Sequence, residues 1–423
     1  MKKYFQNNKT EIFCVAIIII AYIAIRSIHF STILNFSSEQ ASFAMKAFQL
    51  WNSKKIELIG PPISWRYEGR YFFQGSITYY MMIPFLLLGG WDPIKSSYSM
   101  VLFGSLMAVV LYKAVSLLAS RKTAILVTLF FIFLPFYIDY SRFFWNPNLQ
   151  FLLNPLLLLW MGLYQKTRKN IYLFLVSFSS GVLMLFHYQF FLIILGLIIY
   201  YLFIKKIRGL SVLIFFLGFP LGFSPLIIFE LRNKFYNLQT LYLFLQHREK
   251  VFPKGGHIFD IFTSYYMLSP SLYAMVVFFS LLERRITNKL LVITGSVLII
   301  WALIKYLPSP SHAFGTANDW NVGMELKVNA LINKNKRESY NIVNLSYDTV
   351  AAVQKYLLTI SHKELKPDEY YHNEYLFVVA GSTQDMDRSK SYEVAFFTPR
   401  KIMQEWKLNG THTLYLLQSQ KLR

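Results

Sequence analysis

The chain has 423 residues, of which 55% are hydrophobic and 18% are aromatic. A soluble protein of this length carries more charge and fewer aromatic residues, so the composition favours a membrane protein. The net charge of +21 lies mostly before residue 308, where 29 Lys and Arg residues face only 10 Asp and Glu residues. These basic residues occupy short loops between apolar runs, which is typical of topology signals and anionic-lipid contact rather than nucleic-acid binding. The single cysteine, Cys14, excludes an intrachain disulfide and a Cys metal cluster.

Apolar runs long enough to cross a bilayer recur through the first 307 residues. The first run follows Lys2, Lys3 and Lys9 and has no small-residue cleavage site after it, which predicts an uncleaved signal-anchor helix. We predict nine membrane spans, at residues 12–28, 97–118, 123–140, 149–164, 171–187, 189–204, 211–230, 266–282 and 289–306.

The short apolar stretch 76–90 decides the orientation of everything after it. If it does not cross the membrane, the basic loops that contain Arg121, Lys166, Lys205 and Arg284 all lie on the same side as the N-terminus. If it crosses, all four loops move outside. The positive-inside rule favours the first arrangement. We therefore expect a multi-pass protein of the plasma (inner) membrane, with a cytoplasmic N-terminus and an extracytoplasmic C-terminal domain.

This topology places three segments outside, namely the loop 29–96, the turn 140–148 and the loop 231–265. Loops outside the membrane usually carry few basic residues. The loop 231–265 nevertheless carries five: Arg232, Lys234, Arg248, Lys250 and Lys254. Two explanations stay open, a phosphate-bearing ligand or a loop that faces lipid headgroups.

Residues 308–423 differ from the rest, because their charges are evenly spread and no apolar run is long enough to span. We therefore expect a membrane domain at 1–307 and an accessory domain at 308–423. The accessory domain has the pattern of a small α/β fold, with strands at 340–345, 375–381 and 412–418, a helix at 346–360 capped by Ser346 or Asp348, and a second helix at 399–407. A substrate-recognition or lid role and a purely structural role both fit this domain.

Acidic residues are scarce in the membrane part, and Glu39 and Glu68 of the first outer loop are the ones of most interest. Ser37 or Ser38 can cap a helix that begins beside Glu39. The apolar face of this helix carries Phe43, Ala44, Leu50 and Trp51. A carboxylate at this position faces lipid headgroups and suits catalysis. It also suits a plain structural role, because an acid at the start of a helix favours the helix dipole.

The turn Tyr140–Asn148 is a second candidate. Arg142 can fork to a phosphate, and Trp145, Asn146 and Asn148 can contact a sugar. Trp, Tyr and Arg also favour the membrane interface for purely structural reasons. His187, at the end of the fifth predicted span, is a third candidate, although a packed or interfacial histidine is the commoner case.

The sequence has no HExxH, no Cys/His cluster, no GxxxxGK[ST], no GxSxG and no DxD motif. Metalloprotease, P-loop ATPase and serine-hydrolase functions therefore lack support.

Over about residues 10–165 the chain resembles the GT-C superfamily of polyprenyl-phosphate-sugar-dependent glycosyltransferases. It looks most like bacterial relatives of the protein O-mannosyltransferases and of the aminoarabinose transferase of lipid A. The most specific part is the turn Ser141–Asn148, which is similar to an Arg-x-x-Trp-Asn-Pro-Asn turn of one bacterial subgroup. The other matching stretches are Glu39-Gln40 with Phe43-Ala44, Gly60-Pro61-Pro62, Gln74–Tyr80 and Ala119–Lys122.

The resemblance implies a GT-C-like α-helical membrane protein, with about nine spans plus juxtamembrane helices and a small C-terminal α/β extracytoplasmic domain. It implies inverting transfer of a sugar from polyprenyl phosphate to an acceptor hydroxyl of a protein, lipid or glycan, with Glu39 as the general base. Taking the residues and the resemblance together, we expect the substrate to be bound by Arg66, Glu68, Arg70, Gln74, Tyr79, Tyr80, Arg142, Trp145, Asn146, Asn148 and His187.

Three positions depart from the family pattern. Glu39 stands where Asp is usual, and Gln74 stands where some relatives have a phosphate-binding Lys. Asn146 replaces a second acid found in some relatives, which favours an enzyme without a metal or other cofactor. An inactive or altered-specificity member, a transporter or flippase of lipid-linked sugars and a non-catalytic membrane scaffold stay open as alternatives.

Overall fold

A computed structural model describes residues 9–247, 264–361 and 372–420 of the chain. These residues form two compact units. Unit 1 comprises Met1–Ile28, Gln49–Gly90 and Lys95–Pro308, and unit 2 comprises His29–Phe48, Trp91–Ile94 and Ser309–Arg423. The main division lies close to the predicted boundary after residue 307. The first outer loop, which the sequence assigns to the membrane part as a whole, is divided between the two units.

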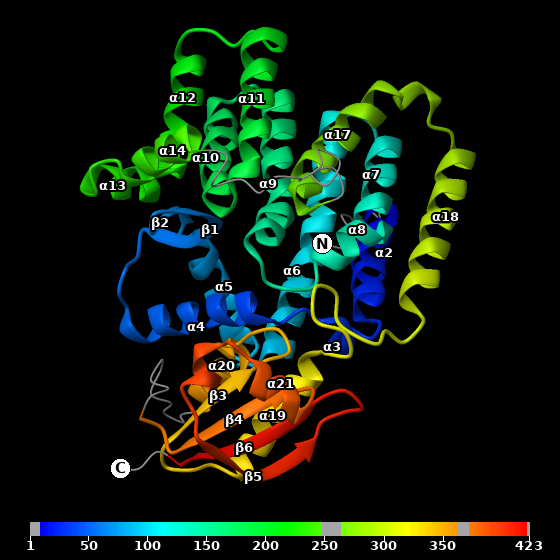
Figure 1. Ribbon diagram of the computed structural model, residues 1–423. Helices are drawn as coiled ribbons and strands as arrows, with labels where there is room; N and C mark the ends of the chain where they lie inside the picture. Colours follow the sequence, from blue (N-terminus) through cyan, green and yellow to red (C-terminus); the bar gives the residue numbers. More distant parts are fainter. Residues whose placement is uncertain (1–8, 248–263, 362–371, 421–423) are drawn as a thin grey trace. The chain divides into compact units, whose positions relative to one another are not determined.

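Unit 1 is mostly helical (Figure 1). Helix α9 packs on α10, which packs on α12, while α7 contacts α2, α17 and α18. The helical elements of unit 1 are α2 (Lys9–Ser27), α5 (Ile77–Leu88), α6 (Pro93–Leu118), α7 (Arg121–Phe133), α8 (Pro135–Tyr140), α9 (Asn146–Thr167), α10 (Asn170–Phe186), η1 (Tyr188–Phe190), α11 (Phe191–Ile199), η2 (Tyr200–Ile204), α12 (Leu210–Gly222), α13 (Ser224–Arg232), α14 (Tyr236–Gln246), η3 (Tyr265–Met267), α17 (Leu268–Leu281), η4 (Glu283–Arg285) and α18 (Asn288–Tyr306).

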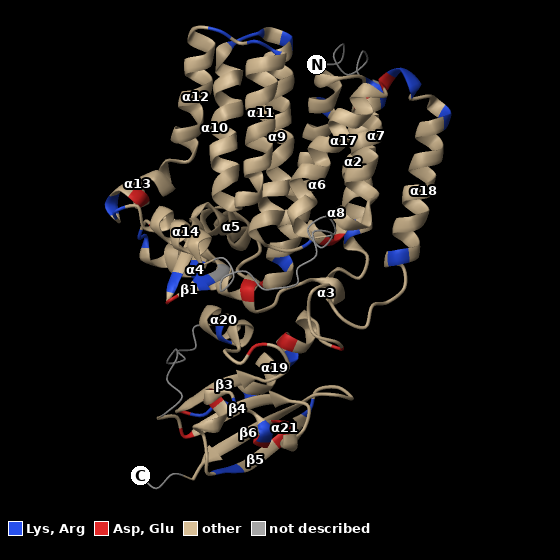
Figure 2. Cartoon of the chain, turned by 45° about the horizontal axis from the view of Figure 1, so that its top comes forward, with Lys and Arg blue, Asp and Glu red and all other residues tan. Residues whose placement is uncertain are grey.

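Charged residues of unit 1 gather at the ends of these helices, and the middle stretches are largely uncharged (Figure 2). The exposed surface of the middle stretches is apolar, as Leu213 and Leu217 of α12 and Val292, Val297 and Trp301 of α18 illustrate. Exposed apolar side chains in such numbers favour contact with lipid over contact with water.

Two described helices, α6 and α18, are long and apolar enough to cross a membrane by length and composition. The pair α12 and α13 makes a third if it is counted as one span, although it is bent by 65°. The prediction of about nine spans is not supported. An α-helix rises about 1.5 Å per residue, so the 13 residues of α7 and the 14 of α17 fall well short of a bilayer core of about 30 Å.

The first outer loop contains a β-hairpin that was not predicted. Strand β1 (Ile59–Tyr67) pairs antiparallel with β2 (Arg70–Gly75), and the two-residue turn is Glu68-Gly69. Both turn residues have positive φ, 47° and 73°, which is typical of the tight turns that join hairpin strands. The stretch 76–90 forms the 12-residue helix α5, about 18 Å long.

Unit 2 is built on a four-stranded mixed sheet. Its order is β3-β4-β6-β5, and only the β3–β4 pair is parallel. The elements of unit 2 are α3 (Phe30–Ile33), the first part of α4 (Ser38–Ser53), α19 (Val322–Lys334), β3 (Tyr340–Asn344), α20 (Ala352–Ile360), β4 (Tyr375–Ala380), α21 (Thr383–Arg388), α22 (Tyr392–Ala395), β5 (Arg400–Lys407) and β6 (Thr413–Ser419).

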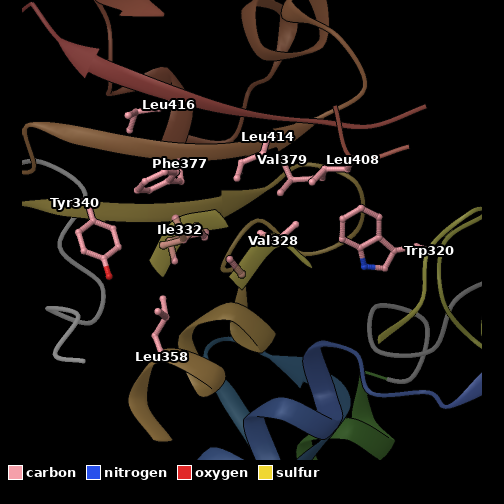
Figure 3. Close-up of a cluster of buried hydrophobic side chains, with 12 residues drawn as sticks. Trp320, Val328, Ile332, Tyr340, Leu358, Phe377, Val379, Leu408, Leu414 and Leu416 are labelled. Atoms are coloured by element: carbon pink, nitrogen blue, oxygen red, sulfur yellow. The ribbon is translucent and has the colours of Figure 1, made fainter. Parts of the chain in front are cut away.

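Successive side chains of a strand point to opposite faces of the sheet, so the apolar residues of the central strands give unit 2 a core on each face. On β4, Phe377 and Val379 belong to a cluster with residues of α19 and α20, which Figure 3 shows. Leu376 and Val378 of the same strand belong to a second cluster, which includes Met386 of α21 and Val394 of α22. Unit 2 is therefore a small three-layer α/β fold, as the sequence predicts.

The three predicted strands of this domain are confirmed, with shifts of one residue at some ends. The helix predicted at 346–360 begins only at Ala352, because Asp348 accepts from the backbone N–H groups of Val350 and Ala352 in the preceding turn. The helix predicted at 399–407 is wrong. That segment is strand β5, and it pairs along its length with β6.

A buried carboxylate, Glu325, ties α19 to the segments around it. Trp320 donates its indole Nε1–H to Glu325 Oε1 at 2.7 Å, and the Tyr347 hydroxyl and the Gln354 amide also donate to this carboxylate. Burial raises the pKa of Glu325 to about 7, an effect that these three donors oppose and the charge of Asp348 reinforces.

This raised pKa predicts that unit 2 is more stable at pH 5 than at pH 8. The pKa of Glu325 in the unfolded chain is about 4.3. Its stabilising contribution is therefore complete below that value and is lost as the pH rises through about 7. We expect the free energy of unfolding, measured with denaturant, to fall by up to about 3 kcal/mol between these pH values. The Glu325→Gln variant, which cannot titrate, serves as the control. An equal pH slope in both proteins would contradict the assignment.

Candidate functional site

Arg26 is a fully buried cation at the end of α2 that the sequence analysis missed. Its guanidinium donates to Ser141 Oγ at 2.6 Å and to the carbonyls of Ile132 and Phe131 at 3.0 and 3.2 Å. In a continuous helix the Phe131 carbonyl would accept from residue 135, but Pro135 has no N–H. Arg26 thus binds the carbonyls that the break between α7 and α8 leaves open.

Arg142 lies in the turn between α8 and α9 and is buried as well. Its Nη2 donates to the carbonyl of Ile25 at 2.8 Å, and its guanidinium carbon lies 4.5 Å from the centre of the Tyr306 ring. Its Nε is buried and has no hydrogen-bond partner among the described residues. Burial lowers the pKa of Arg142 to about 10, so the side chain is still a cation at neutral pH.

Among the described residues, Asp139 is the acid whose charge acts on both arginines, and it is itself engaged. Lys305 Nζ lies 2.6 Å from Asp139 Oδ2, and the Tyr306 hydroxyl donates to Oδ1 at 2.6 Å. The described residues at this place, which we call the arginine centre, therefore comprise two arginines and one lysine but one carboxylate. A buried positive charge without a counter-charge is costly, so this centre suits an anion.

A row of amide side chains follows the buried face of α9. Asn146, Gln150 and Asn154 recur every fourth residue, and all three are buried. The Asn146 amide donates to Gln74 Oε1 and to the carbonyl of Phe186, the latter at 3.0 Å. We call this row the α9 amide ladder. The predicted site residues Gln74 and Asn146 therefore meet at its first rung.

The ladder continues to α10, to the residue that follows it and to α17. Gln150 Nε2 donates to the carbonyls of Leu183 and His187 at 2.9 and 2.7 Å. Ser269 of α17 bridges the next rungs, because its Oγ donates to Gln150 Oε1 at 3.1 Å and accepts from Asn154 Nδ2 at 2.8 Å. Polar groups in an apolar helix interior are costly unless paired, so the ladder fixes how α9, α10 and α17 meet.

Replacing Gln150 by Leu tests the ladder. The carbonyls of Leu183 and His187 would lose their donor and stay buried, so we expect a loss of about 2 kcal/mol in the free energy of unfolding in detergent. Gln165→Leu is the matched control, because Gln165 is only partly buried near the other end of α9, where it donates to the Leu118 carbonyl at 3.4 Å and accepts from the Tyr200 hydroxyl at 3.2 Å. Equal stability of the two variants would refute the structural role of the ladder.

Trp145 and His187 both lie against Tyr265. The ring centres of Trp145 and Tyr265 are 4.4 Å apart, and the His187 ring meets Tyr265 and Tyr266 edge-on at 5.5 and 5.7 Å. His187 Nδ1 accepts from the backbone N–H of Gln189 at 3.3 Å. The structure therefore brings Trp145 and His187 together through Tyr265.

Two more polar atoms near the turn are buried without a hydrogen-bond partner among the described residues, Trp145 Nε1 and Asn148 Oδ1. The amide nitrogen of Asn148 is used, since it donates to the carbonyl of Phe143 at 3.0 Å. With Arg142 Nε, the turn thus holds two buried donors and one buried acceptor whose hydrogen-bonding capacity is unused within the described part of the chain.

The other predicted binding residues lie on or near the hairpin. Arg66 and Glu68 are exposed there, and Arg70 contacts Gln239 of α14 at 3.5 Å. Tyr79 is buried in α5, and the Tyr80 hydroxyl accepts from the backbone N–H of Glu57 at 2.8 Å. The hairpin packs against α13 and α14.

Glu39 belongs to unit 2 and lies exposed in the first turn of α4. The helix begins at Ser38, as predicted, and the Gln40 side chain accepts from the backbone N–H and the hydroxyl of Ser37. On the predicted apolar face, Phe43, Ala44 and Leu50 are buried, whereas Trp51 is exposed. Arg142 and the amide ladder belong to unit 1.

Among the described residues, no group of three or more His, Cys, Asp or Glu side chains is placed to hold a metal ion. Comparison of the chain with protein-family models, with curated proteins and with solved structures finds no match.

Proposed function

We propose that this protein is an inverting glycosyltransferase that transfers a sugar from polyprenyl phosphate to an acceptor hydroxyl at the extracytoplasmic face of a membrane. The observation that carries the proposal is the excess positive charge of the arginine centre. Arg26 and Arg142 are both buried, and Asp139, the one acid near them in the described part of the chain, already binds Lys305 and Tyr306.

A phosphate matches this centre in charge and in hydrogen-bonding groups. A guanidinium presents N–H groups in a planar fork that matches two phosphate oxygens, and the buried Nε of Arg142 has no partner among the described residues. Arg26 makes its hydrogen bonds to neutral groups, so its charge stays available to a nearby anion. An arginine held this way needs little rearrangement when a leaving phosphate gains charge.

The chemical step is a single displacement at the anomeric carbon. The acceptor oxygen forms a bond to that carbon, and the bond from the carbon to the phosphate oxygen breaks. Polyprenyl phosphate leaves with the bonding electron pair, which Arg142 stabilises, and the hydroxyl proton passes to a general base. The family resemblance gives the role of general base to Glu39, which lies exposed in the first turn of α4.

The test is incubation of membranes that contain the full-length protein with a panel of polyprenyl-phosphate sugars. We expect release of polyprenyl phosphate with at least one donor. Transbilayer movement of an intact donor, with no release for any sugar in the panel, would favour a flippase and overturn the proposal.

A further inference from the structure

Helix α14 has three distinct faces. Asn237, Thr240 and Phe244 are buried. A second face is apolar and exposed, with Leu238, Leu241, Tyr242 and Leu245 at the spacing of one helical stripe. The third face is polar and carries Gln239 and Gln246, which are both exposed. An exposed helix with an apolar stripe beside a polar one is typical of a segment that lies in the plane of a membrane surface.

The buried face of α14 is fixed to the hairpin. The Asn237 side chain accepts from the backbone N–H of Phe73 at 3.0 Å and donates to the Phe73 carbonyl at 2.9 Å. Glu230 of α13 caps the helix, because its two carboxylate oxygens accept from the backbone N–H groups of Asn237 and Leu238 at 3.1 and 3.2 Å. These hydrogen bonds fix the first turn of α14, and the buried Thr240 and Phe244 continue the same face, so the exposed stripe is held in one direction.

The chain reaches α14 from an apolar helix that changes direction. Leu213, Leu217 and Leu221 of α12 are exposed, and the pair α12 and α13 is bent by 65°. Two exposed cations, Arg232 and Lys234, follow at the junction between α13 and α14 (Figure 2). The chain therefore bends away from the axis of α12, passes two cations and then presents an exposed apolar stripe. This order is expected where a chain runs along lipid headgroups.

We propose that α14 is an interfacial helix, whose stripe Leu238, Leu241, Tyr242 and Leu245 enters the bilayer while Arg232 and Lys234 bind the phosphates of anionic phospholipids. The sequence leaves two explanations for the basic residues of the loop 231–265, a phosphate-bearing ligand or lipid headgroups. For Arg232 and Lys234 the proposal favours lipid headgroups. The glycosyl-transfer proposal is not required, because none of the readouts below involves sugar transfer.

The first experiment measures the depth of α14 in a bilayer. Full-length Cys14→Ser protein with either Leu245→Cys or Gln246→Cys is spin-labelled and placed in nanodiscs of phosphatidylcholine and phosphatidylglycerol. We expect the label at 245 to collide with oxygen and to be shielded from a water-soluble nickel complex, and its neighbour at 246 to show the reverse. Equal nickel access at both positions would overturn the proposal.

The second experiment tests the headgroup preference. A fluorophore at position 245 reports quenching by spin-labelled phosphatidylglycerol or spin-labelled phosphatidylcholine. Because a basic residue near an anionic surface contributes about 1 kcal/mol, we expect phosphatidylglycerol to be favoured about fivefold or more, and Arg232→Gln with Lys234→Gln to abolish this preference. The matched control is Lys205→Gln with Lys206→Gln, in the loop before α12, which keeps it.

Added inorganic phosphate separates a lipid surface from a site for the free anion. We expect it to leave the quenching unchanged. Loss of the preference on adding phosphate, or equal quenching by the two lipids in the protein with Arg232 and Lys234 intact, would contradict lipid binding at this junction.

Discussion

Replacing Glu39 by Gln is expected to lower the rate of sugar transfer by a factor of about 10² to 10⁴ while the protein stays folded. The amide is close in size to the carboxylate but cannot take the acceptor proton. Because Glu39 is exposed, its replacement by Gln should not destabilise the protein, so a loss of activity would not be caused by unfolding. The measurement is the initial rate of polyprenyl phosphate release at saturating donor.

The control for this substitution is Glu338→Gln, which changes an exposed carboxylate elsewhere in unit 2. Its rate should equal that of the unmodified protein. Full transfer activity in the Glu39→Gln variant would remove Glu39 from the mechanism. An Asp at position 39, the residue usual in the resembled family, should retain part of the rate because it keeps the base.

The second large effect is expected at Arg142. Its replacement by Gln removes the guanidinium fork to which we assign the leaving phosphate, and we expect the transfer rate to fall by about 10² to 10³. Lys at this position keeps the charge but not the planar fork, so it should restore the rate only in part.

Arg208→Gln is the matched control for Arg142, since it removes an exposed cation from the loop before α12. We expect it to leave transfer unchanged. If Arg142→Gln and Arg208→Gln have the same rate, the arginine centre has no part in transfer. Because Arg142 is buried, unfolding of the purified variants by denaturant must be compared alongside the rates.

Much of unit 2 was predictable because its central strands are short runs rich in β-branched and aromatic residues. YNIVN and YLFVVA carry the β-branched and aromatic residues of a buried strand, and both form strands where expected. Strand β5 was mistaken for a helix because RKIMQEWK contains good helix formers, and its exposed face offers no apolar pattern. Pairing with β6, a tertiary effect, decides its conformation.

The number of spans was overestimated because hydropathy does not show where a helix ends. The apolar run 123–140 contains Leu134-Pro135, and the helix breaks there into α7 and α8. The run 211–230 contains a bend between α12 and α13, where Phe223 separates Gly222 from Ser224-Pro225. Both runs look continuous in a hydropathy window, although each is two helices.

The sequence predicts the candidate site only where its residues are adjacent in the chain, as they are in the turn before α9. Arg142, Trp145 and Asn146 are neighbours in the chain, and the sequence analysis named all three. Arg26 was missed because its partner Ser141 lies 115 residues away. The α9 amide ladder left a usable signal, since Asn146, Gln150 and Asn154 repeat every fourth residue in an otherwise apolar helix.

The most direct test of the arginine centre is the affinity of the purified protein for polyprenyl phosphate compared with the uncharged polyprenol of the same length. If the centre binds the phosphate, polyprenyl phosphate should have the lower Kd, and Arg142→Gln should raise that Kd while leaving the Kd of polyprenol unchanged. Equal affinity for the two lipids in the unmodified protein would contradict the proposed site.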